Sequence, residues 1–199
     1  GNTDLKPEKS TQATWGIAFT PTRNLSLAMD YWRVQMRDTL QFESINAVLA
    51  DPQKYASAYI VDPYPYTRNF GAINFHYIGL LLKMQNLGAS FKDGLDLDMR
   101  YRVPMDWGRV MLGAQATYVL NSKEKANSDA NWVSDLAAYS TVTDQVTPRL
   151  RGRLMFNLER ENMNWQLNAN YTSDYTDKNI TAFNLATNKS ETVAGHQVP

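Results

Sequence analysis

The chain has 199 residues, with 20 basic and 20 acidic side chains and no cysteine. The balanced charge produces no overall field pointing to nucleic acid, and the lack of cysteine excludes disulfides, thiol nucleophiles and thiolate metal sites. No apolar run approaches the roughly 20 residues that a membrane-spanning helix requires. The residues after Gly1 lack the regions of a signal peptide, so an exported protein is expected to begin upstream, with this chain as a piece of it.

Two extended segments, residues 12–20 and 25–40, open the predicted sheet. The first alternates apolar and polar residues until Pro21, which cannot donate to a strand ladder. In the second, the apolar positions keep one phase as far as Tyr31 and then shift by one residue at Trp32. The shift indicates either a β-bulge or the point at which the strand leaves its apolar environment.

Residues 72–103 are predicted to form one very long strand, preceded by a long loop over residues 41–71. Near its end every second residue from Leu95 to Val103 is apolar. The intervening residues are all charged: Asp96, Asp98, Arg100 and Arg102. Because successive side chains of a strand point to opposite faces, this strand has one apolar face and one charged face. The pattern suits a soluble sheet with its apolar face inward or a membrane barrel with that face outward, and periodicity does not choose between them.

Three further strands are predicted over residues 109–120, 148–159 and 164–175. Long polar loops are expected over residues 121–147 and 176–199. The six strands are therefore joined alternately by short and long connections, and an antiparallel meander gathers the short turns at one end and the long loops at the other. This asymmetry is typical of outer-membrane barrels.

Several stretches resemble TonB-dependent outer-membrane receptors. Residues 2–10 resemble the N-P-x-L-K-P-E-x-S segment that precedes a barrel strand in that family, with Thr3 where the family usually has proline. Further resemblances follow in order along the chain: residues 25–34 (L-S-x-D-Y-Y-x-I), 86–88 with 94–97 (N-x-G and G-[VL]-[DE]-L), 148–151 (P-R-x-R) and 170–177 (N-Y-x-x-x-Y). Together they cover nearly the whole chain.

The resemblance implies an all-β fold, an antiparallel meander forming about six strands of a large transmembrane β-barrel in the bacterial outer membrane. It implies energy-coupled uptake of a scarce nutrient, of the iron-chelate, cobalamin or oligosaccharide class. The implied partners are outer-membrane lipid, the remainder of the barrel, a plug domain, an inner-membrane energy-coupling complex reached through the plug, and a small-molecule or oligosaccharide ligand. The plug and the last barrel strands have no counterpart in this sequence. No nucleic acid, cofactor or enzymatic activity is expected.

Two groups of side chains are candidate functional residues. The charged face is predicted to line the barrel lumen; the alternative is a hydrated face of mutually paired charges. Its members are Asp96, Asp98, Arg100, Arg102, Arg151 and Arg153. The second group lies in the long loops at the predicted outer mouth and is predicted to bind ligand, since aromatic and arginine side chains are favoured in binding hot spots. It consists of Tyr64, Tyr66, Arg68, Trp132 and Tyr139; loop packing is the alternative.

No pattern in the sequence supports an enzyme or a metal site. The two histidines, His76 and His196, are far apart without ligand spacing, and no phosphate loop or nucleophile motif occurs. The competing hypothesis from another class is a soluble extracellular β-sandwich that binds carbohydrate through its aromatic loops. The two hypotheses differ in the apolar face, which meets lipid in a barrel and is sealed inside a protein core in a sandwich.

Overall fold

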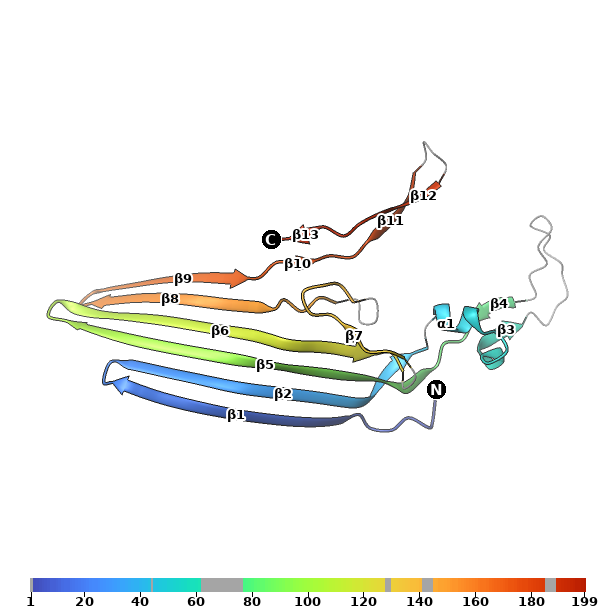
Figure 1. The fold of residues 1–199 in the computed structure, drawn as a ribbon, viewed down its shortest axis with the longest axis horizontal. Helices are drawn as coiled ribbons and strands as arrows, with labels where there is room; N and C mark the ends of the chain where they lie inside the picture. The colour runs from blue at the N-terminus through green and yellow to red at the C-terminus, as the bar shows by residue number, and fades with distance from the viewer. Residues whose placement is uncertain (1, 44, 62–76, 128–129, 141–144, 185–188) are drawn as a thin grey trace.

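The computed structural model describes residues 2–43, 45–61, 77–127, 130–140, 145–184 and 189–199. Six long strands form one antiparallel sheet in the order β1-β2-β5-β6-β8-β9, with β7 paired to β6 (Figure 1). Their bounds are β1 (Lys9–Thr22), β2 (Leu25–Phe42), β5 (Met84–Met105), β6 (Gly108–Lys125), β7 (Val133–Ser134), β8 (Leu150–Arg160) and β9 (Met163–Thr172). The predicted all-β antiparallel meander is confirmed.

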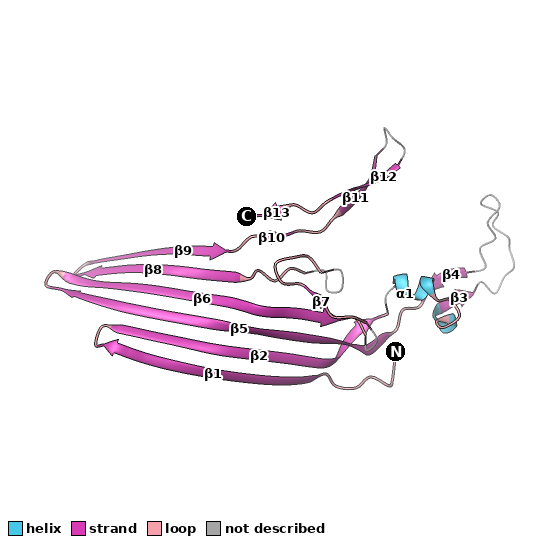
Figure 2. Ribbon diagram, in the orientation of Figure 1, coloured by secondary structure: helices cyan, strands magenta, loops and turns pink. Residues whose placement is uncertain are grey.

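The connections at the two ends of the sheet differ in length. Residues 23–24, 106–107 and 161–162 form the short turns at one end. Beyond the other end lie small elements (Figure 2): α1 (Ile45–Ala50), the 3-10 helix η1 (Ala56–Ala58), β3 (Tyr59–Val61), β4 (Tyr77–Leu80), β10 (Tyr175–Thr176), β11 (Ile180–Asn184), β12 (Lys189–Val193) and β13 (Gln197–Val198). The pairs β3–β4, β10–β13 and β11–β12 are separate from the main sheet. The predicted asymmetry of short turns and long connections is therefore confirmed.

The single strand predicted over residues 72–103 is divided in the structure. Residues 81–83 separate β4 from β5, and β4 pairs with β3 instead of joining the main sheet. The partner strand β2 ends at Phe42, opposite Met84, so the chain before Met84 has no neighbour in the main sheet to continue the ladder. Alternation in the sequence could not reveal this, because it reports extended backbone without naming the partner.

The change of apolar phase at Tyr31 is not a bulge. The pairing of β2 with both of its neighbours is regular around this residue, and the register shifts lie elsewhere, near Thr22 and beyond Arg37. Side chains therefore keep alternating between the faces, and the face that is apolar before Tyr31 carries polar residues after it. The strand leaves its apolar environment at Tyr31, the second of the two predicted alternatives.

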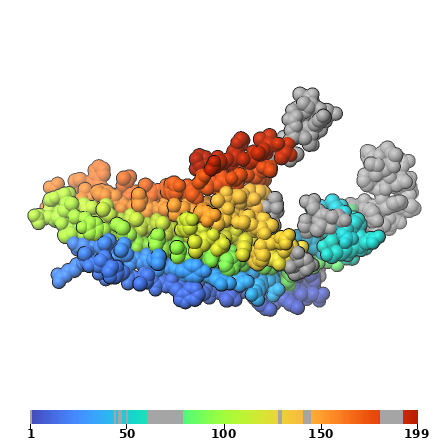
Figure 3. Space-filling view, in the orientation of Figure 1, coloured from blue at the N-terminus to red at the C-terminus, as the bar shows by residue number. Residues whose placement is uncertain are grey.

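The long strands form a single sheet with two unlike faces; Figure 3 shows these strands lying side by side on the face turned to the viewer. We call the apolar face the side that carries Trp15, Ile17, Met29, Leu97, Met99, Leu154 and Leu167, and the polar face the side that carries Asp30, Asp96, Asp98, Thr117, Arg151 and Arg153. On the apolar face Leu154 is 62% exposed and Leu167 is 68% exposed. No second sheet covers these side chains among the described residues, so the packed core of a β-sandwich is not formed there.

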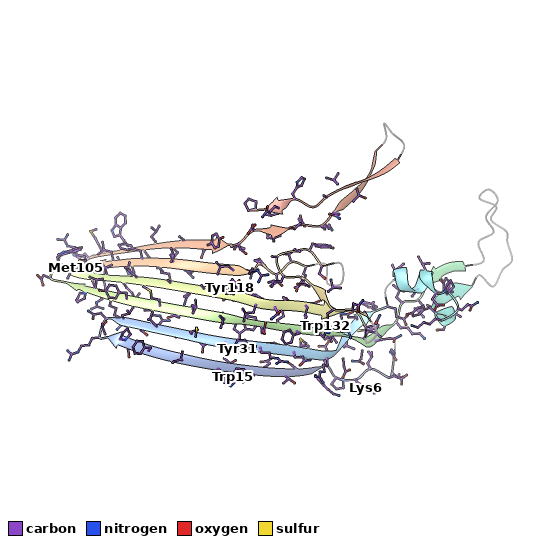
Figure 4. The ribbon with its side chains drawn as sticks, viewed as in Figure 1. Lys6, Trp15, Tyr31, Met105, Tyr118 and Trp132 are labelled. Carbon is purple, nitrogen blue, oxygen red and sulfur yellow. The ribbon has the colours of Figure 1, made fainter. Side chains whose placement is uncertain are left out.

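Aromatic residues border the apolar face at both ends. Toward the loops, the rings of Trp15 and Tyr31 stack with centroids 5.6 Å apart, and Tyr118 lies in the same cross-strand row (Figure 4). Toward the short turns lie the exposed side chains of Trp107 and Trp165. On β5 the apolar stretch from Leu95 to Val103 is nine residues long, which matches the about 9–11 residues of a strand that crosses a bilayer.

Candidate ligand site at the loop end of the sheet

A cavity of about 550 Å³ lies where the loops meet the polar face. It is lined by Tyr139, Gln145, Val146, Pro148, Arg151, Thr172, Tyr175, Asp177 and Lys178. The volume falls within the roughly 300–1,000 Å³ of small-molecule sites. Its side chains come from four stretches of chain: the loop after β7, the start of β8, the end of β9, and the segment around β10. The cavity therefore exists only because the fold brings distant loops together.

Backbone hydrogen bonds fix Tyr139 beside β10. The N–H of Tyr139 donates to the carbonyl of Thr176 at 2.9 Å, and the N–H of Thr176 donates to the carbonyl of Ala137 at 3.0 Å. On the other side, the N–H of Ser140 donates to the carbonyl of Gln145 at 3.0 Å. The segment 137–140 is thus held between two stretches of loop, and its aromatic side chain is placed by main-chain contacts.

The cavity presents two cations and two aromatic rings. Lys178 Nζ lies 5.6 Å from the ring centroid of Tyr139, within the range of a cation–π contact. Among the described residues neither Lys178 nor Arg151 forms an ion pair. Asp177 also lines the cavity, but its Oδ1 already accepts a hydrogen bond from the backbone N–H of Lys178 at 2.7 Å. The arrangement favours a ligand that carries negative charge.

A buried polar cluster anchors the loop that carries Tyr139. Asp135 is 0% exposed, and its Oδ2 accepts hydrogen bonds from Thr147 Oγ1 at 2.6 Å and from Lys92 Nζ at 3.2 Å. Lys92 also lies 3.8 Å from Glu124. Burial raises the pKa of Asp135, but the hydroxyls of Ser122 and Thr147 and the Lys92 ammonium outweigh it, so the pKa lies below its usual value. The carboxylate remains charged and ties the loop to β5.

The polar face separates acidic from basic side chains. A second cavity, of about 370 Å³, brings together Asp96, Asp98, Arg151 and Arg153 with Asp30 from β2. Thr117 Oγ1 donates to Asp96 at 2.7 Å and Gln115 Nε2 donates to Asp98 at 2.9 Å. These neutral residues stand between the acids of β2 and β5 and the arginines of β8, so the two charges do not pair directly.

The other two predicted residues of this face lie nearer the short turns and do not line the cavity. Arg100 Nε lies 3.2 Å from Asp98 Oδ1, and the backbone N–H of Arg102 donates to Asn24 O at 2.8 Å. The polar face therefore combines paired charges, such as Arg100, with arginines that have no ion-pair partner among the described residues.

The predicted loop group is divided by the structure. Tyr64, Tyr66 and Arg68 lie outside the described residues. Tyr139 lines the larger polar cavity, but Trp132 does not; its ring instead lies near Lys123 and Lys125, at 5.4 and 5.7 Å from their Nζ atoms. The loop position of both aromatics could not show that they belong to different surfaces.

Sequence reasoning missed Tyr175, Lys178 and Asp30. Tyr175 lies within the stretch 170–177 that resembles the receptor family, but only the fold shows that it lines the same cavity as Tyr139. Asp30 lies directly opposite Asp96 in the register, and strand pairing is not visible in one sequence. His76 lies outside the described residues, and no cluster of His, Asp or Glu within the described part could hold a metal ion.

Comparison with protein families gives one match. A family model described as TonB dependent receptor-like, beta-barrel matches residues 1–197. Comparisons with curated proteins and with solved structures gave no match. Within the described ranges, no helix combines the length and the apolar character needed to cross a membrane.

Proposed function

Because the chain belongs to the TonB-dependent receptor-like β-barrel family, a family of outer-membrane receptors and transporters, we propose that it takes part in uptake of an anionic nutrient chelate. It supplies part of the barrel wall and of the outer mouth. The nutrient falls within the iron-chelate, cobalamin or oligosaccharide class, and the charges of the loop cavity favour an iron chelate. The single observation that carries this choice is the meeting of Arg151 and Lys178 with Tyr139 and Tyr175 in one cavity.

In the proposed arrangement the apolar face meets lipid and the polar face lines the lumen. The exposure of Leu154 and Leu167 supports this, since such side chains in a single-layer sheet need an apolar solvent. The outer strands β1 and β9 each have only one neighbour in the described sheet. Further barrel strands satisfy these edges, since unpaired backbone groups are unfavourable in hydrocarbon.

The family membership also implies a plug domain and TonB-type energy coupling from the inner membrane. In our proposal the plug contacts the polar face, where Arg153 and Asp30 have no ion-pair partner among the described residues. Members of the family are transporters, and the role proposed for this chain is to bind and pass its ligand without chemical conversion.

The test is a binding and uptake experiment on the complete receptor that contains this chain. The probes are ferric citrate as an anionic chelate, cyanocobalamin, and maltohexaose as a neutral oligosaccharide. Arg151→Gln combined with Lys178→Gln is expected to weaken ferric citrate binding by about tenfold or more, since a hydrogen bond to a charged group contributes about 1.5–3 kcal/mol. The control is Arg23→Gln, which removes a single positive charge in the exposed turn at the opposite end.

Three results would contradict the proposal. The first is unchanged ferric citrate affinity in the double variant. The second is a loss of equal size in Arg23→Gln, which would trace the effect to overall charge. The third is binding of maltohexaose with no binding of ferric citrate, which would assign a neutral ligand to the cavity.

A further inference from the structure

Basic side chains gather on the apolar-face side of the sheet just beyond its aromatic border. Arg33 lies two residues beyond Tyr31 on the same face of β2. Phe91 on β5 and Lys123 on β6 are cross-strand partners and lie on this face as well. The register therefore places cations on the outer side of the wall, immediately above the level at which the apolar side chains end.

Two aromatic rings hold these cations together. Arg33 Cζ lies 4.9 Å and Lys123 Nζ lies 5.1 Å from the ring centroid of Phe91. Lys123 Nζ and Lys125 Nζ lie 5.4 and 5.7 Å from the ring of Trp132. Since Lys123 contacts both rings, the three cations form one continuous surface. We call Arg33, Phe91, Lys123, Lys125 and Trp132 the basic patch.

Two of the three cations in this patch, Arg33 and Lys123, form no ion pair among the described residues. The carboxylate on the same face, Asp93, is only 7% exposed and accepts hydrogen bonds from Tyr31 Oη at 3.0 Å and from Asn121 Nδ2 at 2.9 Å. Its two oxygens accept hydrogen bonds from these neighbours and form no ion pair with Arg33, its cross-strand partner, so Arg33 and Lys123 remain available to an external anion.

A hollow on the apolar face lies on the other side of the aromatic border from the basic patch and suits a hydrocarbon chain. Its volume is about 730 Å³, and the small residues among those that line it are Ala114, Ala116, Gly152 and Ala169. The larger side chains of Leu97 and Leu154 also line it, and Leu97 lies two residues from the border row of Leu95. A molecule spanning both features has an anionic head and an apolar tail.

We propose that the basic patch binds the phosphate groups of a lipid headgroup in the outer leaflet while an acyl chain of the same lipid occupies the hollow. Charge-assisted hydrogen bonds from arginine and lysine are strong when phosphate is the acceptor. Phosphates of a bilayer lie at the level just beyond the hydrocarbon, which is where the aromatic border ends. The orientation rests on the proposed function, but the lipid site is independent of the ligand cavity.

The test measures lipid binding by the complete receptor purified in detergent. Diphosphorylated lipid A is titrated, and retained lipid is counted by native mass spectrometry. Arg33→Gln combined with Lys123→Gln is expected to lower the affinity for this lipid by about tenfold or more, and monophosphorylated lipid A is expected to bind with intermediate affinity. Arg23→Gln, which removes a single positive charge at the opposite end of the sheet, is the control. Phe91→Leu, which keeps an apolar side chain but removes the ring, is expected to weaken binding severalfold.

Each remaining outcome is decisive. Equal affinity of the double variant and the unaltered receptor would overturn the proposal, as would equal binding of neutral phosphatidylcholine. Complete competition by millimolar inorganic phosphate would show capture of free phosphate instead of lipid. If the double variant does not fold, Phe91→Leu and the comparison of the two lipid A forms decide the question. Ferric citrate binding is measured in parallel, so failure of the lipid site is distinguished from failure of the proposed ligand site.

Discussion

Placing a charge on the apolar face at Met99 tests the membrane assignment most directly. Met99 lies midway along the apolar stretch of β5, four residues from both Leu95 and Val103. Its side chain is 36% exposed on the apolar face, and its cross-strand partners are Leu27 and Ala114. In the proposed orientation an arginine here faces the centre of the hydrocarbon, without a carboxylate opposite it on either neighbouring strand.

The expected loss of unfolding free energy depends on how deep in the bilayer the substituted residue lies. Arginine at the bilayer midplane of a barrel destabilises it by about 2–4 kcal/mol, falling to about 0–1 kcal/mol near the interfaces. At about 3.3 Å per residue, Leu97 lies about 7 Å and Leu95 about 13 Å from Met99 along the strand. Met99→Arg should thus have the largest effect, Leu97→Arg an intermediate one, and Leu95→Arg the smallest.

The assay is equilibrium unfolding of the complete receptor in phospholipid vesicles with guanidinium. The control is Asn168→Arg on β9, an exposed residue of the polar face between Leu167 and Ala169. It adds the same side chain at a similar level of the sheet but on the polar face, which the proposal turns toward the lumen, and its expected loss is below about 0.5 kcal/mol. Equal losses for Met99→Arg and Asn168→Arg, or no gradient from Met99 to Leu95, would refute the assignment of the apolar face to lipid.

Two further predictions concern packing and acid stability. Gly94→Ala should lower the free energy of unfolding by about 1–3 kcal/mol in the same assay, since the added Cβ would meet the Trp32 ring at 2.6 Å and a backbone oxygen at 2.8 Å. Gly152→Ala should be nearly neutral, because the nearest atom to its added Cβ lies at 3.6 Å. Because the folded pKa of Asp135 lies below its usual value of 3.8, its stabilisation is full above that value and is lost as the pH falls through the folded pKa. Asp135→Asn should therefore lower the thermal midpoint at neutral pH and flatten its fall below about pH 4; an unchanged acid profile would contradict this.

The long strands of the main sheet were predictable because each contains its own alternation of apolar and polar residues. The alternation from Leu95 to Val103 requires only the pleat of an extended chain, and the pairing of β5 with both neighbours is regular over this stretch. The division of residues 72–103 was not predictable, because β4 is extended yet pairs with β3. Whether an extended segment joins the main sheet depends on where its neighbour ends, and Phe42 sets that limit from a distant part of the chain.

The candidate site was predictable only in part, for a related reason. Tyr139 and Arg151 were singled out by residue type, but their meeting in one cavity depends on backbone bonds between loops that follow different strands. Trp132 has the same loop character and lies instead over Lys123 and Lys125. Residue type thus identified side chains able to bind a ligand. The surface to which each side chain contributes depends on backbone contacts between segments far apart in the sequence.

The aromatic border explains why the two halves of these strands are stabilised in different ways. Below Tyr31 the exposed side of the sheet is apolar, and the surrounding solvent, not a protein core, has to accommodate it. Above that level no second sheet covers the strands among the described residues, so the loops need contacts that remain favourable beside water. The cluster of Lys92, Asp135 and Thr147 meets this need, because its charged hydrogen bonds anchor the loop without apolar burial. A chain that replaced this cluster with leucines would add an apolar surface where no apolar partner is available, and its loop would lose the register that positions Tyr139.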